Sequence, residues 1–318
     1  MNIIKFIKNW TLIISILAGI FGYFIYVNLP FLNGTHAFAY EAITIIQPLL
    51  IFTMLFITFC KVNPRQLRLC KWHLWLLLIQ AGFFTLLALT EILLPENQNL
   101  SVVLEGAMLC MICPTATAGA VITRKLGGKV THITTYTILI NLVTALLIPL
   151  LVPFVHTNPD MNISTSAVLI LGKVFPLLLL PFLAAVLLRY LSPRLHFLVS
   201  HCQELSFYLW AVALALATAV TTRSIVHSTV SIETQLWLVV VSLFCCAIQF
   251  FLGKRIGRKY GDSITAGQSL GQKNTVLAIW MGYTFFSPIT SIVGGFYSIW
   301  HNLVNTYQLY QARKKEEK

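Results

Sequence analysis

The segment QSLGQKNTVLAIWMG, residues 268–282, places a lysine amine inside a long apolar region of the chain. Lys273 is flanked by Gln272 and Asn274, while Ser269 and Thr275 supply hydroxyl groups on either side. Inserting an ionisable side chain at membrane depth costs about 2.5–3.5 kcal/mol, so such a residue is a candidate functional group. An amine in this setting can hold an anion, replace a bound cation, or carry a proton. We therefore take these residues as candidate substrate- or ion-binding groups.

A second interruption lies in VVLEGAMLCMICPTATAGAVITRKLGG, residues 102–128. Pro114 removes a helical hydrogen bond and clashes with the preceding turn, and Thr115 and Thr117 follow among small residues. Backbone groups freed in this way are tolerated at membrane depth only where protein, water or ligand satisfies them. The alternative is a simple kink, because Pro and Gly are common in membrane helices. The pairing with the polar segment around Lys273 favours a binding site.

Two more charged residues could serve the same site. Glu105 could pair with Lys273, relay a proton, or lie at the outer mouth. Lys173 could line a crevice and attract an anion, or extend its amine to the membrane surface. Cys110 and Cys113 form a CxxC pair, but no second pair completes a metal-ligand set. We expect these cysteines to pack as small apolar residues, and we predict neither a metal site nor a cofactor.

The composition indicates an all-α polytopic membrane protein. Of 318 residues, 57% are hydrophobic and 10% are charged, whereas a soluble domain typically carries about 25% charged residues. The mean hydropathy is +0.80. Apolar stretches reach the 18 or more residues that cross a hydrocarbon core about 30 Å thick. The predicted membrane spans are 10–29, 37–59, 72–94, 100–123, 131–154, 164–191, 204–222, 231–253, 264–286 and 290–311.

Ten spans divide into two runs of five, and an odd number of spans per repeat inserts the second copy upside down. This inverted-repeat plan is typical of secondary transporters. The interrupted spans, 100–123 and 264–286, are the fourth of each half. Interruptions at matching positions of two halves point to a transporter binding site.

The basic residues report how the chain lies in the membrane. Its net charge is +12, but Lys and Arg collect in alternate loops, and the other loops contain only Arg223. Short cytoplasmic loops collect Lys and Arg, so both termini are predicted to be cytoplasmic and the protein to lie in the inner (plasma) membrane. The surplus explains attraction to anionic lipid and gives no support to nucleic-acid binding. The alternate basic groups are Lys5 and Lys8; Lys61, Arg65, Arg68 and Lys71; Arg124, Lys125 and Lys129; Arg189 and Arg194; Lys254, Arg255, Arg258 and Lys259; and Arg313, Lys314, Lys315 and Lys318.

Three motifs resemble those of the bile acid:sodium symporter family. CPTATAGAVIT (113–123) is similar to its fourth-helix C-P-G-G-T-A-S-N-x-x-T, GQKNTVLA (271–278) to its ninth-helix G-M-Q-N-S-x-L-A, and FYSIWHNL (296–303) to its tenth-helix F-S-x-W-H-N. The resemblance implies panel helices in 1–71 and 161–230, and core helices in 72–160 and 231–318, the last with a basic C-terminal tail. It also implies that the two broken helices cross within the core and that substrate lies between core and panel.

The resemblance also implies two sodium sites, most of whose ligands this chain lacks. Gln80 and Thr137 keep side-chain oxygens at implied ligand positions, whereas Lys273 replaces a glutamine. Implied ligand positions that are altered here are Gly119, Ala120, Ile133 and Ser269. A hard cation needs several oxygen ligands. We therefore expect Lys273 to stand in place of a sodium ion, with proton coupling as a further possibility.

The expected function is secondary active transport of a small amphipathic organic anion: a bile-acid-like compound, another steroid, a pantothenate-like acid or a keto acid. Its partners would be that acid and the lipid bilayer, and no oligomer is required. The alternatives are a sodium-coupled symporter with a rearranged ion site and a non-transporting membrane sensor. An enzyme is not expected, because the membrane segments contain no HExxH, DxxxD or GxSxG motif.

Overall fold

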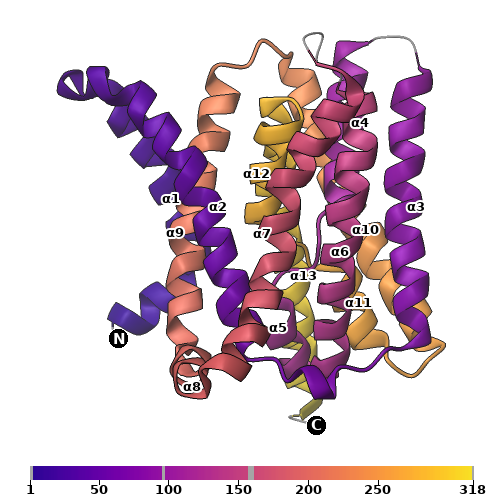
Figure 1. Ribbon diagram of the computed structural model, residues 1–318. Coiled ribbons are helices and arrows are strands. Elements are labelled where there is room, and N and C mark those ends of the chain that lie inside the picture. Colours follow the sequence, from indigo (N-terminus) through magenta and orange to yellow (C-terminus); the bar gives the residue numbers. More distant parts are fainter. Residues whose placement is uncertain (1–2, 95–96, 157–160, 317–318) are drawn as a thin grey trace.

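The computed structural model describes residues 3–94, 97–156 and 161–316, and within these ranges the fold is all-helical (Figure 1). The one β feature of this part of the chain is an isolated bridge between Thr115 and Lys273. The helices are α1 (Ile3–Asn28), η1 (Pro30–Thr35), α2 (His36–Cys60), η2 (Pro64–Gln66), α3 (Lys71–Leu93), α4 (Gln98–Ile112), α5 (Gly119–Lys125), α6 (Val130–Val155), α7 (Ile163–Leu191), α8 (Pro193–His201), α9 (Gln203–Val226), α10 (Ile232–Arg258), α11 (Ser263–Gly271), α12 (Thr275–Phe285), η3 (Pro288–Ser291) and α13 (Ile292–Glu316).

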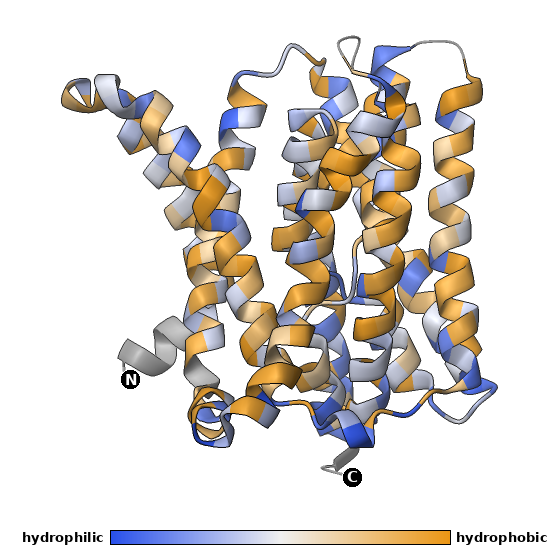
Figure 2. Ribbon diagram, in the orientation of Figure 1, coloured by the Kyte–Doolittle hydropathy of each residue, from blue (hydrophilic) through white to orange (hydrophobic). Residues whose placement is uncertain are grey.

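Seven helices of the described chain are long and apolar enough to cross a membrane. Figure 2 shows hydrophobic residues along the middle of the bundle and hydrophilic ones gathered towards its two ends. Two predicted spans are each divided into a pair of shorter helices: 100–123 into α4 and α5, and 264–286 into α11 and α12. The remaining predicted span, 290–311, lies in α13, which is long enough but more polar than the seven. The seven long apolar helices are α1, α2, α3, α6, α7, α9 and α10.

Several prolines lie inside continuous helices, whereas Pro114 lies where helical structure is interrupted. Pro48 lies inside α2, Pro149 inside α6, and Pro176 and Pro181 inside α7, so each of these helices continues past its proline. Neighbouring helices and local adjustments can satisfy the one carbonyl that each proline frees. At Pro114 the outcome differs, because α4 ends at Ile112 and helical structure resumes at Gly119. The predicted interruption of this span is therefore present.

Helix α10 holds the second interrupted segment against the rest of the bundle, packing on α4, α11 and α13. Gly253 and Gly257 allow the close approach of α10 to α11. A Cβ atom on Gly253 would lie 2.6 Å from the carbonyl oxygen of Ala266, and one on Gly257 would lie 2.6 Å from that of Asp262. Small residues spaced four apart commonly let membrane helices approach in this way. On the other side of the bundle, α1 packs on α9, and α2 packs on α7 and α9.

Both chain ends lie at the same end of the bundle (Figure 1). The links from α2 to α3, α5 to α6, α7 to α8 and α10 to α11 lie there too, and these links and the helix turns beside them carry basic residues that alternate along the sequence. We call this end of the molecule the basic end. The end of α3, the start of α4, the link from α9 to α10 and η3 lie at the opposite end.

Candidate functional site

The two interruptions lie against each other in antiparallel orientation. The amide N–H of Ala116 donates to the Gln272 carbonyl at 2.9 Å, and the N–H of Asn274 donates to the Pro114 carbonyl at 2.9 Å. We call this junction, residues 113–118 and 272–274, the crossover. Backbone groups that would otherwise be unsatisfied at membrane depth are thus paired between two segments that lie far apart in sequence.

The crossover also concentrates side-chain donors on the last carbonyls of α4. Helix α4 ends at Ile112 and Pro114 has no N–H, so the final carbonyls of α4 need other partners. Side chains from three helices and from the crossover itself satisfy four consecutive carbonyl oxygens. The bonds are Gln249 Nε2 to Cys110 O (3.3 Å), Lys273 Nζ to Met111 O (3.3 Å), Gln80 Nε2 to Ile112 O (3.2 Å) and Cys113 O (3.0 Å), and Thr144 Oγ1 to Ile112 O (2.9 Å).

Lys273 therefore places an amine at the carboxyl end of a helix. Its side chain is only 1% exposed and donates to the Met111 carbonyl. The carboxyl end of a helix carries a partial negative charge and favours a cation. In the part of the chain that the structure describes, the ion pairs do not link Lys273 to Glu105. The partners of the amine are thus backbone dipoles and not a carboxylate.

The second interruption is ordered by its own contacts. Asn274 caps α12, because its Oδ1 accepts the N–H of Leu277 at 3.3 Å. Thr115 Oγ1 donates to the Ser269 carbonyl at 2.6 Å, so the first interruption also satisfies the end of α11. A side-chain oxygen at the first position before a helix is a strong capping group. Asn274 and Thr115 thus fix the crossover geometry, as residues between helices must if they are to form a site.

The positions implied as sodium ligands do not form an oxygen cage. The Cδ1 atom of Ile133 would lie 3.1 Å from a Cβ atom on Gly119, so an apolar side chain fills the space there. Thr137 uses its hydroxyl on the Ile133 carbonyl of its own helix, at 2.9 Å. Ser269 is fully buried, and its hydroxyl oxygen has no hydrogen-bond partner. Since a hard cation needs several converging oxygens, these residues do not fit the sodium site that the resemblance implies.

The remaining crossover residues lie nearby with fewer contacts. Gln272 is buried, and its Oε1 has no hydrogen-bond partner. Thr275 is the first residue of α12 and is buried. Thr117 lies in the turn before α5 and is half-buried.

The structure places the two further charged candidates elsewhere. Glu105 is buried near the opposite end, where its Oε2 accepts from Ser287 N (3.1 Å), Ser287 Oγ (2.7 Å) and Thr290 Oγ1 (2.7 Å). Its Oε1 lies 3.3 Å from His156 Nδ1, just beyond α6, and this contact raises the pKa of His156. Lys173 is exposed on α7. Glu105 thus anchors the turn between α12 and α13.

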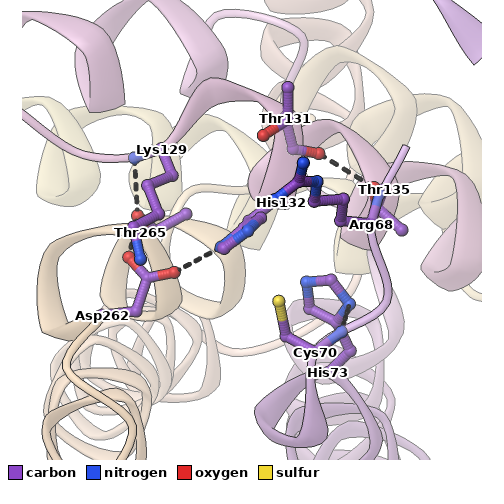
Figure 3. A network of polar contacts seen from close by, with 9 residues as sticks. All are labelled: Arg68, Cys70, His73, Lys129, Thr131, His132, Thr135, Asp262 and Thr265. Atoms are coloured by element: carbon purple, nitrogen blue, oxygen red, sulfur yellow. Dashed lines mark hydrogen bonds and ion pairs between the residues drawn. The ribbon is translucent and has the colours of Figure 1, made fainter. Parts of the chain in front are cut away.

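A second polar network braces the basic end of the bundle (Figure 3). His132 Nδ1 lies 2.6 Å from Asp262 Oδ2, and Thr265 Oγ1 donates to the other oxygen of Asp262. His73 lies near His132, with ring centroids 6.3 Å apart, and its Nδ1 accepts the Cys70 N–H at 3.2 Å. Burial, together with the Asp262 carboxylate, raises the pKa of the Cys70 thiol. The network ties α6 and the start of α3 to the corner between α10 and α11.

Sequence reasoning missed four residues that support the crossover. Gln249 and Thr144 satisfy carbonyls of α4, Tyr297 donates to the Gly271 carbonyl at 2.9 Å, and Tyr136 donates to Gln80 Oε1 at 3.0 Å. Gln249 carried a usable signal, because an amide within the apolar stretch CCAIQFFLG needs a buried partner. The hydroxyl groups carried none, since Thr and Tyr are ordinary residues of membrane helices.

An all-helical bundle with two interrupted helices that satisfy each other is characteristic of membrane transport proteins. The family comparison agrees: the model of the SBF-like CPA transporter family matches residues 9–299, and the chain belongs to this family. This match confirms the family inferred from the three motifs. No curated protein matches the chain. The protein thus belongs to a family of multi-pass transporters, in keeping with the expectation that it is not an enzyme.

Proposed function

We propose that this protein is a secondary active transporter of a small amphipathic organic anion, and that Lys273 occupies the place of a coupling sodium ion. The observation that carries this proposal is the amine of Lys273 on the Met111 carbonyl at the carboxyl end of α4. A buried cation without a carboxylate must be stabilised by dipoles, and the end of a helix supplies them. A sodium ion at the same end would meet both the repulsion of the amine and a shortage of oxygen ligands.

The proposed architecture has ten membrane spans in two inverted five-helix repeats. We assign α4 with α5, and α11 with α12, to the fourth span of each repeat. The core would hold residues 72–160 and 231–318, and the panel 1–71 and 161–230. The packing of α10 on α4, α11 and α13, and of α1 and α2 on α9, supports this division. Transport would follow movement of the core against the panel, which exposes the crossover to each side in turn.

Uptake into liposomes tests the function. Purified protein is reconstituted, and uptake of labelled taurocholate, pantothenate and 2-oxoglutarate is measured with a sodium gradient, a proton gradient or neither. We expect uptake of at least one acid that does not respond to sodium. Uptake driven by the proton gradient and lost in Lys273→Ala would assign the coupling proton to this amine. Absence of uptake for every acid under every gradient would favour the membrane sensor.

A matched control separates the role of Lys273 from the general loss of a lysine. Lys173→Ala makes the same chemical change at an exposed position of α7 and should leave uptake intact. Lys273→Ala should abolish uptake while the protein still elutes as a single folded species. Sodium-dependent uptake by the unaltered protein would contradict the substitution of the ion by Lys273 and would favour a rearranged sodium site.

A further inference from the structure

A polar pocket lies at the end of the bundle opposite the basic end. Its volume is about 830 Å³, and its lining comes from α2, α3, α4, α6, α9, α12 and η3. Pockets that bind small molecules in proteins span about 300–1,000 Å³. The crossover residues are absent from the lining, so this pocket is distinct from the site around Lys273.

The two sides of the pocket differ in charge. Arg223, in the last turn of α9, lies on one side together with the hydroxyl residues Ser224 and Ser228. Glu91 of α3 and Glu105 of α4 lie on the other. Arg223 and Glu105 come from segments that we assign to the panel and the core, respectively. A ligand that spans the pocket would therefore meet the Arg223 cation at one end, and the Glu91 carboxyl group beside the Glu105–His156 pair at the other.

Arg223 is held in a way that leaves its donors available. Its guanidinium carbon lies 4.6 Å above the centre of the Tyr40 ring. This stacking uses the face of the guanidinium group and leaves the N–H groups along its edges free to bind an anion. Among the described residues, Arg223 forms no ion pair with a carboxylate. The alternative explanation is that Arg223 only stabilises the carboxyl end of α9, which carries a partial negative charge.

The two carboxylates differ in how many polar partners their oxygen atoms have within the protein. Glu105 has four polar contacts, with Ser287, Thr290 and His156. Glu91, in contrast, has a buried Oε2 without a hydrogen-bond partner. An unsatisfied buried acceptor is costly, so a ligand that brings a donor to it gains affinity. The carboxylate free to take part in recognition is therefore Glu91.

We propose that the pocket binds a small organic acid, with its anionic group on the Arg223 guanidinium and a hydroxyl or amino donor at its other end facing Glu91. The identity of this ligand as the transported substrate rests on the proposed function, whereas its binding does not. Glu105 already accepts from Ser287 and Thr290 and pairs with His156, whereas Arg223 has no ion pair among the described residues, so the anionic group is placed on Arg223. Acids that carry a donor are distinguished from plain fatty acids by the Glu91 oxygen.

Equilibrium binding to the purified protein in nanodiscs tests both proposed contacts, that of the anionic group with Arg223 and that of the donor with Glu91. The probes are labelled pantothenate and taurocholate, which carry an anionic group and hydroxyls, and octanoate, which carries a carboxylate alone. Arg223→Gln should weaken pantothenate or taurocholate binding by about tenfold or more, the effect of losing a charge-assisted hydrogen bond. Glu91→Gln should reduce the preference for that probe over octanoate.

Arg255→Gln is the matched control, because this arginine also lies over an aromatic ring, 5.9 Å from the centre of Phe251, but towards the basic end. It should bind like the unaltered protein. Equal affinity of Arg223→Gln and Arg255→Gln would overturn the role of Arg223 and support the helix-end explanation. Failure of all three probes to bind would overturn the ligand assignment. Liposome uptake is measured in a separate experiment. If the unaltered protein transports an acid while Arg223→Gln binds the probes unchanged, the role of this pocket is refuted and the proposed transport function is not.

Discussion

Replacing Glu105 by alanine tests how strongly helix α4 is held to the turn between α12 and α13. The carboxylate joins α4 to the turn between α12 and α13 through three hydrogen bonds on Oε2, two from Ser287 and one from Thr290. A hydrogen bond to a charged group contributes about 1.5–3 kcal/mol, although the three are not additive. The pair with His156 adds little, since 52% of that side chain is exposed and such pairs contribute about 0–1 kcal/mol.

Glu105→Ala leaves three neutral donors unsatisfied in a buried setting, at about 1–3 kcal/mol each, so we expect a loss of about 3–5 kcal/mol of unfolding free energy because the three are not additive. At roughly 2 °C per kcal/mol for a chain of this length, the apparent melting temperature should fall by roughly 6–10 °C. Glu105→Gln keeps an acceptor in place, and neutral hydrogen bonds are about half as strong, so about 1–2 kcal/mol should be lost. His156→Ala should cost less than about 1 kcal/mol.

Thermal unfolding of the three variants, followed by tryptophan fluorescence in one detergent, provides the measurement. The expected order of melting temperatures places Glu105→Ala lowest, then Glu105→Gln, then His156→Ala. A loss in His156→Ala as large as in Glu105→Ala would refute the reasoning, because it would show that the histidine, and not the turn, is the partner that matters.

Four more outcomes follow from the contacts. Because its contact with Glu105 raises the pKa of His156 above the ordinary 6.5, this pair should stabilise the fold below about pH 6.5, and the gain should vanish as the pH rises through the raised value; His156→Ala should flatten the melting temperature against pH. Gln80→Leu should lower the melting temperature by several degrees and reduce uptake, because buried carbonyls lose their donor. Asp262→Asn should destabilise the protein by about 1–3 kcal/mol, as denaturation in a urea series would show. Gly253→Ala should destabilise because its Cβ would meet backbone, whereas Gly82→Ala, with open space around it, should be neutral or stabilising on the same thermal assay.

Local chemistry made the interruptions predictable. Pro114 disfavours a continuous helix, although other prolines of this chain lie inside helices, and the amide and amine groups around Lys273 are costly in lipid. Each segment therefore indicated its own break. The meeting of the two breaks was implied by the resemblance of three motifs to a known family, and it agrees with the need to satisfy exposed backbone groups. The partners themselves did not follow, because which side chain reaches the Cys110 or Ile112 carbonyl depends on the rotation of α10 and α6 about their axes. That rotation is set by packing over the whole bundle.

Arg223 stood out in the sequence, but it was used there only to predict how the chain is oriented in the membrane. As the single basic residue in its set of loops, it served to orient the chain in the membrane. Its place above Tyr40, and opposite Glu91 and Glu105, depends on the approach of α2, α3, α4 and α9, which are remote in sequence. The contact between Glu105 and η3 was likewise out of reach, since Ser287 and Thr290 lie more than 180 residues later in the chain.

Under the proposed function, a cation that is covalently attached to the protein changes how the transport cycle can be driven. A sodium ion enters from one side and leaves on the other, so its gradient drives each cycle. Lys273 is covalently attached and returns with the protein, so as a fixed charge it can stabilise the crossover but cannot transmit a gradient. An amine that stays charged therefore implies passive exchange of the anion, in which the direction follows the substrate alone. An amine that releases its proton on one side recovers coupling, because the proton then takes the role that sodium would have had. Moving one such charge through the full membrane potential is worth about 2.3 kcal/mol per 100 mV. The dependence of uptake by the unaltered protein on voltage and on pH therefore separates the two cycles.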